Sequence, residues 1–361
     1  MGNGVLDDPQ ALVRLDRGGM LAAIGTLPEQ LRDGWQRTRN LALPERHLAA
    51  NSVAVLGMGG SAIAGDLVRG IFSDRLKLPI VSVRDYDLPA FVGADTLVVA
   101  VSFSGGTEET VSALAAALER RCPVVAISTG GAIRDVAQRA GLPLLSFPAE
   151  GQPRAAIGYM LALLSGLLER AGALELDRSE IRDAVAAAAG TVEACAPDVP
   201  TEHNPAKQLA WSLVDRLPVV EAAGFLAPVA RRWKAQLNEN SKTIAAHEEL
   251  PEATHNTVVG YEQPEALRDH LYVVFLASPS DHPRSSLRAS VSQELLGMAR
   301  IGHQVVPVAG EGRLAQACSA IALGDFVSTY LAVLYGLDPT PVEAIQRTKE
   351  RLSALDEGTE D

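Results

Sequence analysis

The chain has 361 residues, of which 47% are hydrophobic, and this length is typical of two domains with sizeable cores. Its formal net charge of −12 argues against partners such as nucleic acid or an anionic membrane surface. The three cysteines, Cys122, Cys195 and Cys318, are far apart and odd in number, so they predict neither a disulfide framework nor a zinc site.

The sequence gives no indication of export or membrane insertion. Residues 1–8 are acidic and lack an apolar run, so we expect no signal peptide. No run of about 18 apolar residues is free of charge. Together with the cysteine usage, these features predict a cytoplasmic protein in a reducing compartment and without a membrane span.

Residues 1–45 are predicted to form a helical N-terminal segment, with one helix beginning near Pro28 because proline suits the first helical turn. From Val53 onward, short Val, Ile and Leu runs alternate with amphipathic stretches. This pattern predicts a parallel sheet covered on both faces, over residues 46–172. The predicted strands are 52–57, 79–83, 96–102, 123–128 and 143–147, and the predicted helices are 61–73, 107–120, 131–140 and 154–172.

Residues 173–200 are rich in alanine and end at Pro200, so they are predicted to form a helical connector. Residues 201–338 repeat the strand–helix alternation more loosely, as a second α/β domain, and residues 339–361 form a last helix and a polar tail. The predicted strands are 217–222, 270–277 and 303–308, and the predicted helices are 204–214, 226–239, 284–301, 322–335 and 340–355. The fold class is therefore α/β, with two αβα sandwiches that suggest a duplicated domain.

Two loops rich in glycine and serine follow strand-like runs and open helix-like stretches. The first loop spans residues 57–61 (Gly-Met-Gly-Gly-Ser), and the second contains Ser102, Ser104 and Thr107. Glycine lets the backbone approach an anion closely, and the N–H groups of a helix N-terminus point toward it. Ligands of open parallel sheets bind at the carboxyl ends of the strands, so the two loops predict a small phosphorylated ligand.

Two other interpretations of these loops stay open at this stage. A dinucleotide fold would contain G-x-G-x-x-G, and here the third glycine is missing, although Asp85 could serve as the acid that binds ribose. Each loop could also be a tight strand-to-helix turn without a ligand.

The loops resemble those of the SIS (sugar isomerase) domain, which binds phosphosugars, and the resemblance extends to the bifunctional phosphoglucose/phosphomannose isomerase family. One departure is Gly106, where the family often has Asn. The matching segments occur in the family's order along nearly the whole chain: residues 16–30, 57–66, 153–158, 204–210, 238–242, 254–256 and Lys349. The resemblance implies two SIS-type domains, a homodimer, no metal or other cofactor, and interconversion of fructose 6-phosphate with glucose 6-phosphate and mannose 6-phosphate through a cis-enediol.

The resemblance also implies catalytic roles for four residues. Glu239 matches the family's catalytic glutamate, and a carboxylate can carry a proton between C1 and C2. His255 would open the sugar ring and would come from the neighbouring subunit, with His247 as the nearest alternative. Arg154 would stabilise the enediolate, and Lys349 would assist ring opening.

The remaining assignments concern substrate binding. Ser61, Ser102, Ser104 and Thr107 would hold the phosphate, and Gly59 and Gly60 would let the backbone approach the sugar. Without the family context, Glu239 and Lys349 are ordinary charged groups near helix ends and Arg154 forms a surface salt bridge.

The acidic stretch 248–252 is flanked by His247 and His255, but their order and spacing match no metal-ligand motif. We interpret this stretch as a solvated loop.

Other functions compatible with SIS-type domains are a regulator that binds phosphosugars, a non-catalytic binder, an amidotransferring isomerase and an isomerase of another sugar phosphate. A regulator needs a basic DNA-binding segment, which residues 1–50 lack. The amidotransferring enzyme needs an ammonia-releasing domain with a nucleophilic cysteine, and this chain starts Met1-Gly2-Asn3. Isomerases of heptose or arabinose phosphates usually have one SIS domain.

Overall fold

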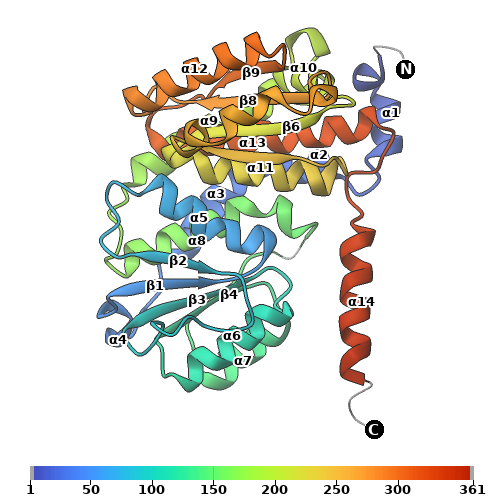
Figure 1. The fold of residues 1–361 in the computed structure, drawn as a ribbon. Coiled ribbons are helices and arrows are strands. Elements are labelled where there is room, and N and C mark those ends of the chain that lie inside the picture. Colours follow the sequence, from blue (N-terminus) through green and yellow to red (C-terminus); the bar gives the residue numbers. More distant parts are fainter. Residues whose placement is uncertain (1–3, 149, 358–361) are drawn as a thin grey trace.

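The structure is a computed structural model that describes residues 4–148 and 150–357. Within these residues two parallel sheets lie at opposite ends of the molecule, and helices fill the space between them and cover their outer faces (Figure 1). The α/β class with two sheets flanked by helices is thus confirmed.

The first sheet consists of five strands in the order β2-β1-β3-β4-β5, and all neighbouring strands are parallel. Its central strands are uncharged and almost entirely buried, as expected for a sheet covered on both faces. The strands are β1 (Ser52–Leu56), β2 (Ile80–Val83), β3 (Thr96–Ser102), β4 (Val124–Ser128) and β5 (Leu144–Leu145). Its helices are α5 (Gly59–Ile71), α6 (Glu108–Glu119), α7 (Gly131–Ala140) and α8 (Ile157–Arg170).

The second sheet has four parallel strands in the order β7-β6-β8-β9. This order repeats β2-β1-β3-β4, so the two halves share one topology, as a duplicated domain would. The strands are β6 (Leu217–Ala223), β7 (Ala246–Leu250), β8 (Leu271–Ala277) and β9 (Gly302–Pro307). Helices α11 (Ala227–Asn240) and α13 (Gly312–Leu334) cover the inner face, and α12 (Pro283–Met298) covers the outer face (Figure 1).

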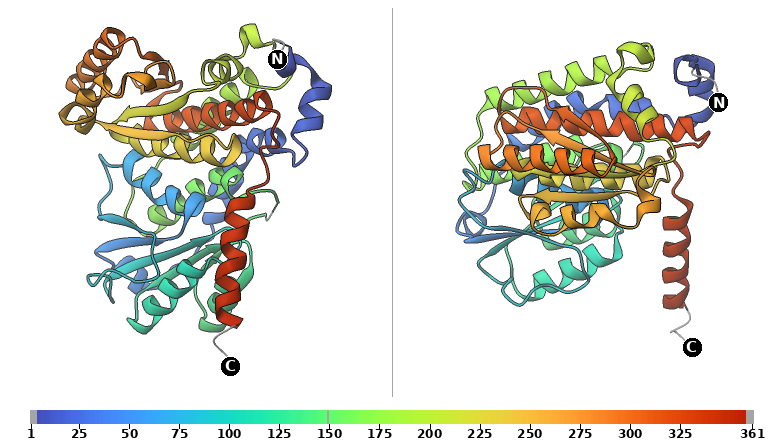
Figure 2. Two further views of the ribbon diagram at one scale, coloured as in Figure 1. Left: turned by 45° about the vertical axis from the view of Figure 1, so that its right-hand side comes forward. Right: turned by 45° about the horizontal axis from the view of Figure 1, so that its top comes forward.

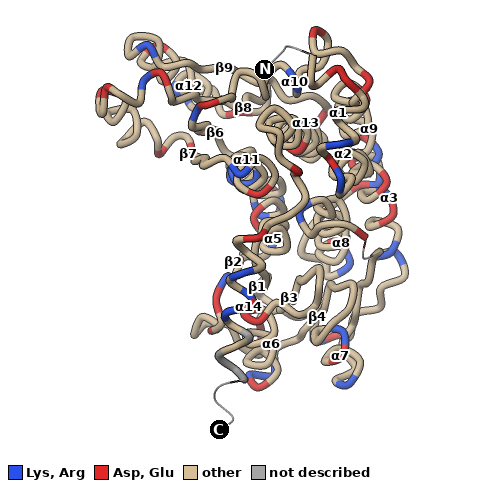
Figure 3. Tube along the Cα trace, turned by 90° about the vertical axis from the view of Figure 1, so that its right-hand side faces the viewer, with Lys and Arg blue, Asp and Glu red and all other residues tan. Residues whose placement is uncertain are grey.

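The remaining helices surround this framework. The α-helices are α1 (Pro9–Leu15), α2 (Met20–Gly25), α3 (Leu27–Thr38), α4 (Glu45–Leu48), α9 (Arg178–Ala194), α10 (Pro205–Ser212) and α14 (Glu343–Glu357). The short 3-10 helices are η1 (Val5–Asp7), η2 (Pro153–Ala155), η3 (Thr201–His203), η4 (Gly224–Leu226), η5 (Glu252–His255), η6 (Thr257–Glu262) and η7 (Glu265–Leu267). Charged residues lie mainly on the helices and loops of the molecule, and the strands of the first sheet are largely free of them (Figure 3).

One hydrophobic core extends across both halves of the molecule. It joins side chains of β1 and α8 to side chains of α11 and α13, and α3 and α9 pack between them. The segment predicted as a connector therefore contains a helix, α9, that belongs to the shared core. The domain boundaries at residues 45, 172, 200 and 338 stay a prediction.

Two elements differ from the sequence-based prediction. The acidic stretch 248–252 is not simply a solvated loop, because residues 246–250 form β7. This strand is at the sheet edge and pairs only with β6. An edge strand can carry charged side chains, so β7 lacks the apolar run by which the other strands were predicted. Helix α13 begins at Gly312, ten residues before the predicted start at 322.

Helix α13 is also the one helix of the described chain that is long and apolar enough to cross a membrane. It has 23 residues with a mean hydropathy of 1.6 in its most apolar window, and 94% of that window is buried inside the protein. The core of the protein therefore accounts for its apolar surface.

Helix α14 has a different environment. It follows α13 after a short extended segment and projects from the body of the molecule (Figures 1 and 2).

The turn after β3 depends on one glycine. Gly105 has φ +71°, and a Cβ atom there would lie 1.6 Å from the carbonyl oxygen of Gly130. We expect Gly105→Ala to lower the free energy of unfolding by more than about 2 kcal/mol, since it adds backbone strain to an overpacked contact. Chemical denaturation measures this change.

Gly106 provides the matched control, since a Cβ atom added there would have no other atom within 4 Å and its φ is not in the left-handed range. We expect Gly106→Ala to change stability by less than about 0.5 kcal/mol. Equal effects of the two substitutions would contradict the steric argument.

Candidate active site

The two glycine- and serine-rich loops lie side by side, because β1 and β3 are neighbouring strands and pair at Leu56 and Ala100. Both loops leave the carboxyl ends of these strands and lead directly into α5 and α6. In the described chain, neither helix N-terminus is capped by a side chain. Their N–H groups are therefore oriented to bind a negatively charged group at this edge of the sheet.

The loop after β3 is stabilised by its own hydroxyl groups. The Oγ of Ser102 accepts a hydrogen bond from the Gly105 N–H at 3.0 Å and lies 2.9 Å from Oγ1 of Thr107. Ser104 Oγ accepts from the Gly106 N–H at 3.3 Å and is on an exposed residue. Ser102 is fully buried, so its position favours a role in shaping the loop, whereas Ser104 faces outward.

The first loop lies against the segment that carries Arg154. A Cβ atom on Gly60 would lie 3.5 Å from both the Cα of Arg154 and the carbonyl oxygen of Pro153. Ser61 is buried in the first turn of α5, and Gly59 is exposed with φ +48°. Two predicted groups of site residues, the loop glycines and Arg154, are therefore brought together.

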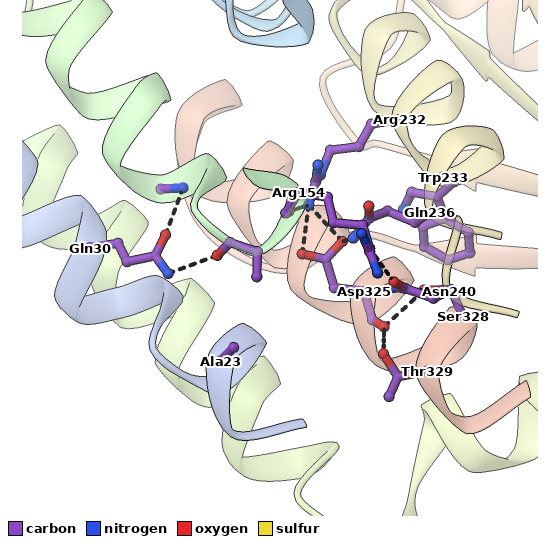
Figure 4. A network of polar contacts seen from close by, with 12 residues as sticks. Ala23, Gln30, Arg154, Arg232, Trp233, Gln236, Asn240, Asp325, Ser328 and Thr329 are labelled. Carbon is purple, nitrogen blue, oxygen red and sulfur yellow. Dashed lines mark hydrogen bonds and ion pairs between the residues drawn. The ribbon is translucent and has the colours of Figure 1, made fainter. Parts of the chain in front are cut away.

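Arg154 lies almost entirely inside the protein, with 3% of its surface exposed. Its Nε donates to Oδ1 of Asn240 at 2.7 Å (Figure 4). Its Nη2 donates to the carbonyl oxygens of Pro339 at 2.9 Å and Thr340 at 2.7 Å. On the other side, Gln30 of α3 donates to the carbonyl oxygen of the next residue, Ala155 (Figure 4). The guanidinium is thus fixed before any ligand binds.

The Nη1 end of Arg154 has the longer contacts. It lies 3.3 Å from Oε1 of Gln152 and 3.5 Å from Oε2 of Glu239. The Glu239 side chain is 27% exposed, so the pair lies at the boundary between the interior and solvent. Nη1 is therefore the group of Arg154 that could donate a hydrogen bond to an oxygen atom of a ligand.

A network of buried polar residues holds the Arg154 segment against the second half of the chain (Figure 4). Arg232 donates to both carboxylate oxygens of Asp325, at 2.9 and 2.8 Å, and to the carbonyl oxygen of Arg154 at 2.9 Å. Gln236 donates to the same carboxylate at 2.7 Å. Arg232, Gln236 and Asn240 are spaced four residues apart, so they share the face of α11 that meets α13.

Burial and neighbouring charges set the electrostatics of this cluster. Burial lowers the pKa of Arg154, and the carboxylate of Glu239 opposes that change. Burial raises the pKa of Asp325, and Arg232 opposes it.

Lys242 follows α11 and links the end of this helix to the segment before α14. Its Nζ donates to the carbonyl oxygens of Glu239 and Asn240 and also to those of Asp338 and Pro339. Burial lowers the pKa of Lys242, with a further contribution from the charge of Arg154. The lysine and Arg154 together anchor the segment that precedes α14.

Sequence reasoning did not assign a role to Lys242, Asn240, Arg232 or Asp325. The polar residues at every fourth position of α11 were a usable signal, since an apolar face would be expected against a core helix.

His255 and Lys349 lie elsewhere in the chain. His255 is exposed in η5, which follows the carboxyl end of β7, whereas Glu239 lies near the amino end of that strand. The two ends of the 14-residue α11, which connects β6 to β7, are roughly 20 Å apart. Lys349 is exposed on the projecting helix α14. A single chain therefore does not bring His255 to Glu239.

The arrangement suits one kind of chemistry. A carboxylate and a fixed guanidinium lie beside two loops whose helix N-termini attract an anion. Such a set can bind a phosphorylated compound, remove a proton next to a carbonyl group and stabilise the oxyanion that results.

Comparison with known proteins agrees with this arrangement. Residues 202–352 match the family model described as the bacterial phospho-glucose isomerase C-terminal SIS domain. A protein of Caldicellulosiruptor bescii named bifunctional phosphoglucose/phosphomannose isomerase is 36% identical over 93% of this chain and 99% of its own length. A protein of the same name from Aquifex aeolicus is 35% identical over 83% of this chain and 90% of its own.

The fold is also similar to solved structures. The crystal structure of a hypothetical protein from Thermus thermophilus superimposes with a TM-score of 0.75 at 17% identity, covering 96% of this chain and 93% of the other. At this identity the likeness concerns the fold alone.

The Arg232–Asp325 pair gives a testable expectation. Asp325→Ala leaves a buried guanidinium without its carboxylate, so we expect the free energy of unfolding to fall by about 3–5 kcal/mol. The double substitution Arg232→Met with Asp325→Leu removes both charges and should cost at least about 2 kcal/mol less than the single one. Denaturant unfolding measures both variants, and equal losses would contradict the view that an unpaired charge is the main cost.

Proposed function

Because the chain belongs to the bifunctional phosphoglucose/phosphomannose isomerase family, we propose that it interconverts fructose 6-phosphate with both glucose 6-phosphate and mannose 6-phosphate. Assignment as a sugar-phosphate isomerase is supported by similarity to this family over nearly the whole length of the chain.

The single observation that carries the proposal is the Glu239–Arg154 pair beside the two loops. Aldose–ketose isomerisation moves a proton between C1 and C2, and Glu239 can remove it from one carbon and return it to the other. Negative charge develops on the enediolate oxygen at the same time. The Nη1 group of Arg154, 3.5 Å from Glu239, can donate to that oxygen.

The fixed position of Arg154 makes it suitable for this task. Its other donors are already bound to Asn240 and to two backbone carbonyl oxygens. A donor that is held in place before the reaction does not have to reorganise when charge appears, and such preorganised groups can lower a barrier by several kcal/mol.

The phosphate would bind at the N-termini of α5 and α6. Ser61, Ser104 and Thr107 would supply hydrogen bonds to it without adding charge, and Gly59 and Gly60 would let the backbone approach the sugar. Ser102 would act through the loop, since it is buried and bonded to the Gly105 N–H. The first loop contacts the Arg154 segment, which would place the sugar between the phosphate and Glu239.

Both aldoses follow from one intermediate. Glucose and mannose 6-phosphate differ only at C2, and they give the same cis-enediol once the C2 proton has been removed. One carboxylate can serve both epimers if the intermediate rotates about the C2–C3 bond. The small side chains of Gly59, Gly60 and Ser61 are compatible with space for this rotation.

Ring opening would need a second copy of the chain. His255 is the proposed group, and in one chain it lies at the opposite end of α11 from Glu239. A homodimer that places His255 of one subunit near Glu239 of the other would complete the site, and Lys349 on α14 would assist. We further propose that the protein acts in the cytoplasm and needs no metal for this chemistry.

The direct test is an assay of the purified protein on fructose 6-phosphate in deuterated water, with and without EDTA. We expect both aldose phosphates, with deuterium at C2 of each and no effect of EDTA. Formation of glucose 6-phosphate alone would reject the dual range but keep the isomerase. Loss of activity with EDTA would reject the metal-free mechanism.

The role of Glu239 predicts a large effect on turnover. Glu239→Gln keeps the shape of the side chain but removes the base, so kcat should fall by about 10³-fold or more while binding of the sugar phosphate stays nearly unchanged. Glu119→Gln at the exposed end of α6 is the control and should retain full activity. A decrease of only about tenfold for Glu239→Gln would mean that another group acts as the base.

The cross-subunit role of His255 predicts complementation. Glu239→Gln and His255→Ala subunits should each be inactive alone, but a mixture should regain activity because one site of each hybrid dimer is intact. Subunit exchange is monitored in parallel by native mass spectrometry. Exchange without recovery would show that both residues act within one chain.

A further inference from the structure

A cavity lies in the second half of the chain, between the outer face of the second sheet and α12. Its volume is ≈ 470 Å³, which is in the range typical of small-molecule sites. The ends of β6, β7, β8 and β9, the loop after β8 and residues 285–293 of α12 line it. It thus occupies the carboxyl edge of a parallel sheet, where ligands of such folds bind, and the proposed isomerase site does not use it.

The cavity contains a buried carboxylate without a partner. Glu221 of β6 is 0% exposed, and neither of its carboxylate oxygens forms a hydrogen bond within the described chain. It is in register with Phe275 of β8, which also lines the cavity. Burying a carboxylate is costly for a folded protein unless it is paired, so Glu221 is the group of this cavity that a cationic ligand would pair with.

The surroundings of Glu221 raise its affinity for protons. Burial raises the pKa of Glu221 to about 7, and the neighbouring carboxylate of Glu248 on β7 adds to the shift. The nearby hydroxyl of Tyr261 opposes this increase. From α12, Arg288 donates to Thr254 and is not part of the lining. A cation that entered the cavity would meet a carboxylate without competition from a basic side chain of the lining.

Comparison with the first half shows why a phosphate would not bind here. The loop after β8 also has a serine hydroxyl that accepts from its own backbone, since the Ser280 N–H donates to Oγ of Ser278, as the Gly106 N–H donates to Oγ of Ser104 after β3. In this second loop, however, Asp281 Oδ2 accepts the Ser278 N–H at 2.9 Å. The chain's own carboxylate therefore takes a donor that an anion would need.

The N-terminus of α12 is occupied as well. The side chain of His282 accepts a hydrogen bond from the Arg284 N–H and caps the helix. No Lys, Arg or His is among the described residues that line the cavity, and two of the lining residues, Glu221 and Asp281, are acidic. The site repels anions and attracts a cation.

The other lining residues indicate an organic cation with hydroxyl groups. Ser285, Ser286, Ser290 and Gln293 of α12 provide hydrogen-bonding groups, opposite apolar residues of the strands. No three carboxylate, histidine or cysteine groups gather as metal ligands in the described chain. We propose that this cavity binds a hydroxylated primary ammonium compound of monosaccharide size, with its ammonium group paired to Glu221 and its hydroxyl groups bound along α12.

Glucamine and sorbitol form a matched pair of probes, since they differ only in an ammonium group in place of one hydroxyl. Isothermal titration calorimetry of the full-length protein at pH 8 should show glucamine binding at least tenfold more tightly than sorbitol. Between pH 8 and pH 6 the affinity for glucamine should fall on the order of tenfold, because Glu221 takes up a proton while an alkylamine stays charged. Sorbitol should show no such dependence.

Three variants test the site. Glu221→Gln should weaken glucamine binding at least tenfold at pH 8 and remove its pH dependence. Ala289→Leu, which adds bulk to the cavity from α12 and leaves Glu221 in place, should abolish binding even if Glu221→Gln folds poorly. Ser104→Ala, in the proposed phosphate loop, should leave glucamine binding unchanged.

These measurements test the binding proposal independently of the isomerase assignment. Equal affinities for glucamine and sorbitol, or unchanged glucamine binding in both Glu221→Gln and Ala289→Leu, would overturn the proposal. Isomerase activity of these two variants should match that of the unaltered protein, so a failure of the isomerase assignment would leave the binding result interpretable.

Discussion

The burial of Arg154 is the constraint on which the rest of the site depends. A guanidinium that is 3% exposed must have its N–H groups bound, because an unpaired buried charge costs several kcal/mol. Asn240 and the carbonyl oxygens of Pro339 and Thr340 meet this demand. The requirement therefore fixes the end of α11, the loop before α14 and the segment beside the first glycine-rich loop in one arrangement. Glu239 is positioned as a consequence, since it precedes Asn240 in the same helical turn.

The parts of the fold that follow from local pattern were predictable from the sequence. Runs such as residues 97–101, uncharged and apolar throughout, occur in strands covered on both faces, and glycine-rich turns mark where such strands end. β7 was missed because an edge strand needs only one apolar side and can carry Glu248 and Glu249. The early start of α13 was missed because its first turns contain small and polar residues that pack only in the context of the tertiary structure.

Only part of the candidate site was predictable from the sequence. The loop residues and Arg154 are recognisable because glycine, serine and arginine in those positions match a family pattern. The residues that hold them, Arg232 and Asp325, are 93 positions apart and belong to helices that look ordinary one at a time. No local pattern encodes that contact. It arises from the packing of α11 on α13, which the sequence of either helix does not specify alone.

The two halves share a strand order but differ in how their loops treat charge. After β3, the helix that follows has no side-chain cap in the described residues, and the loop hydroxyls bond only to one another and to backbone N–H groups. After β8, Asp281 and His282 take up the corresponding donors. One topology thus provides an edge that attracts anions in the first half and an edge that repels them in the second. Because the strand order is common to both halves, this difference must come from the loops. A few loop side chains therefore determine whether the carboxyl edge of each sheet attracts an anion or a cation.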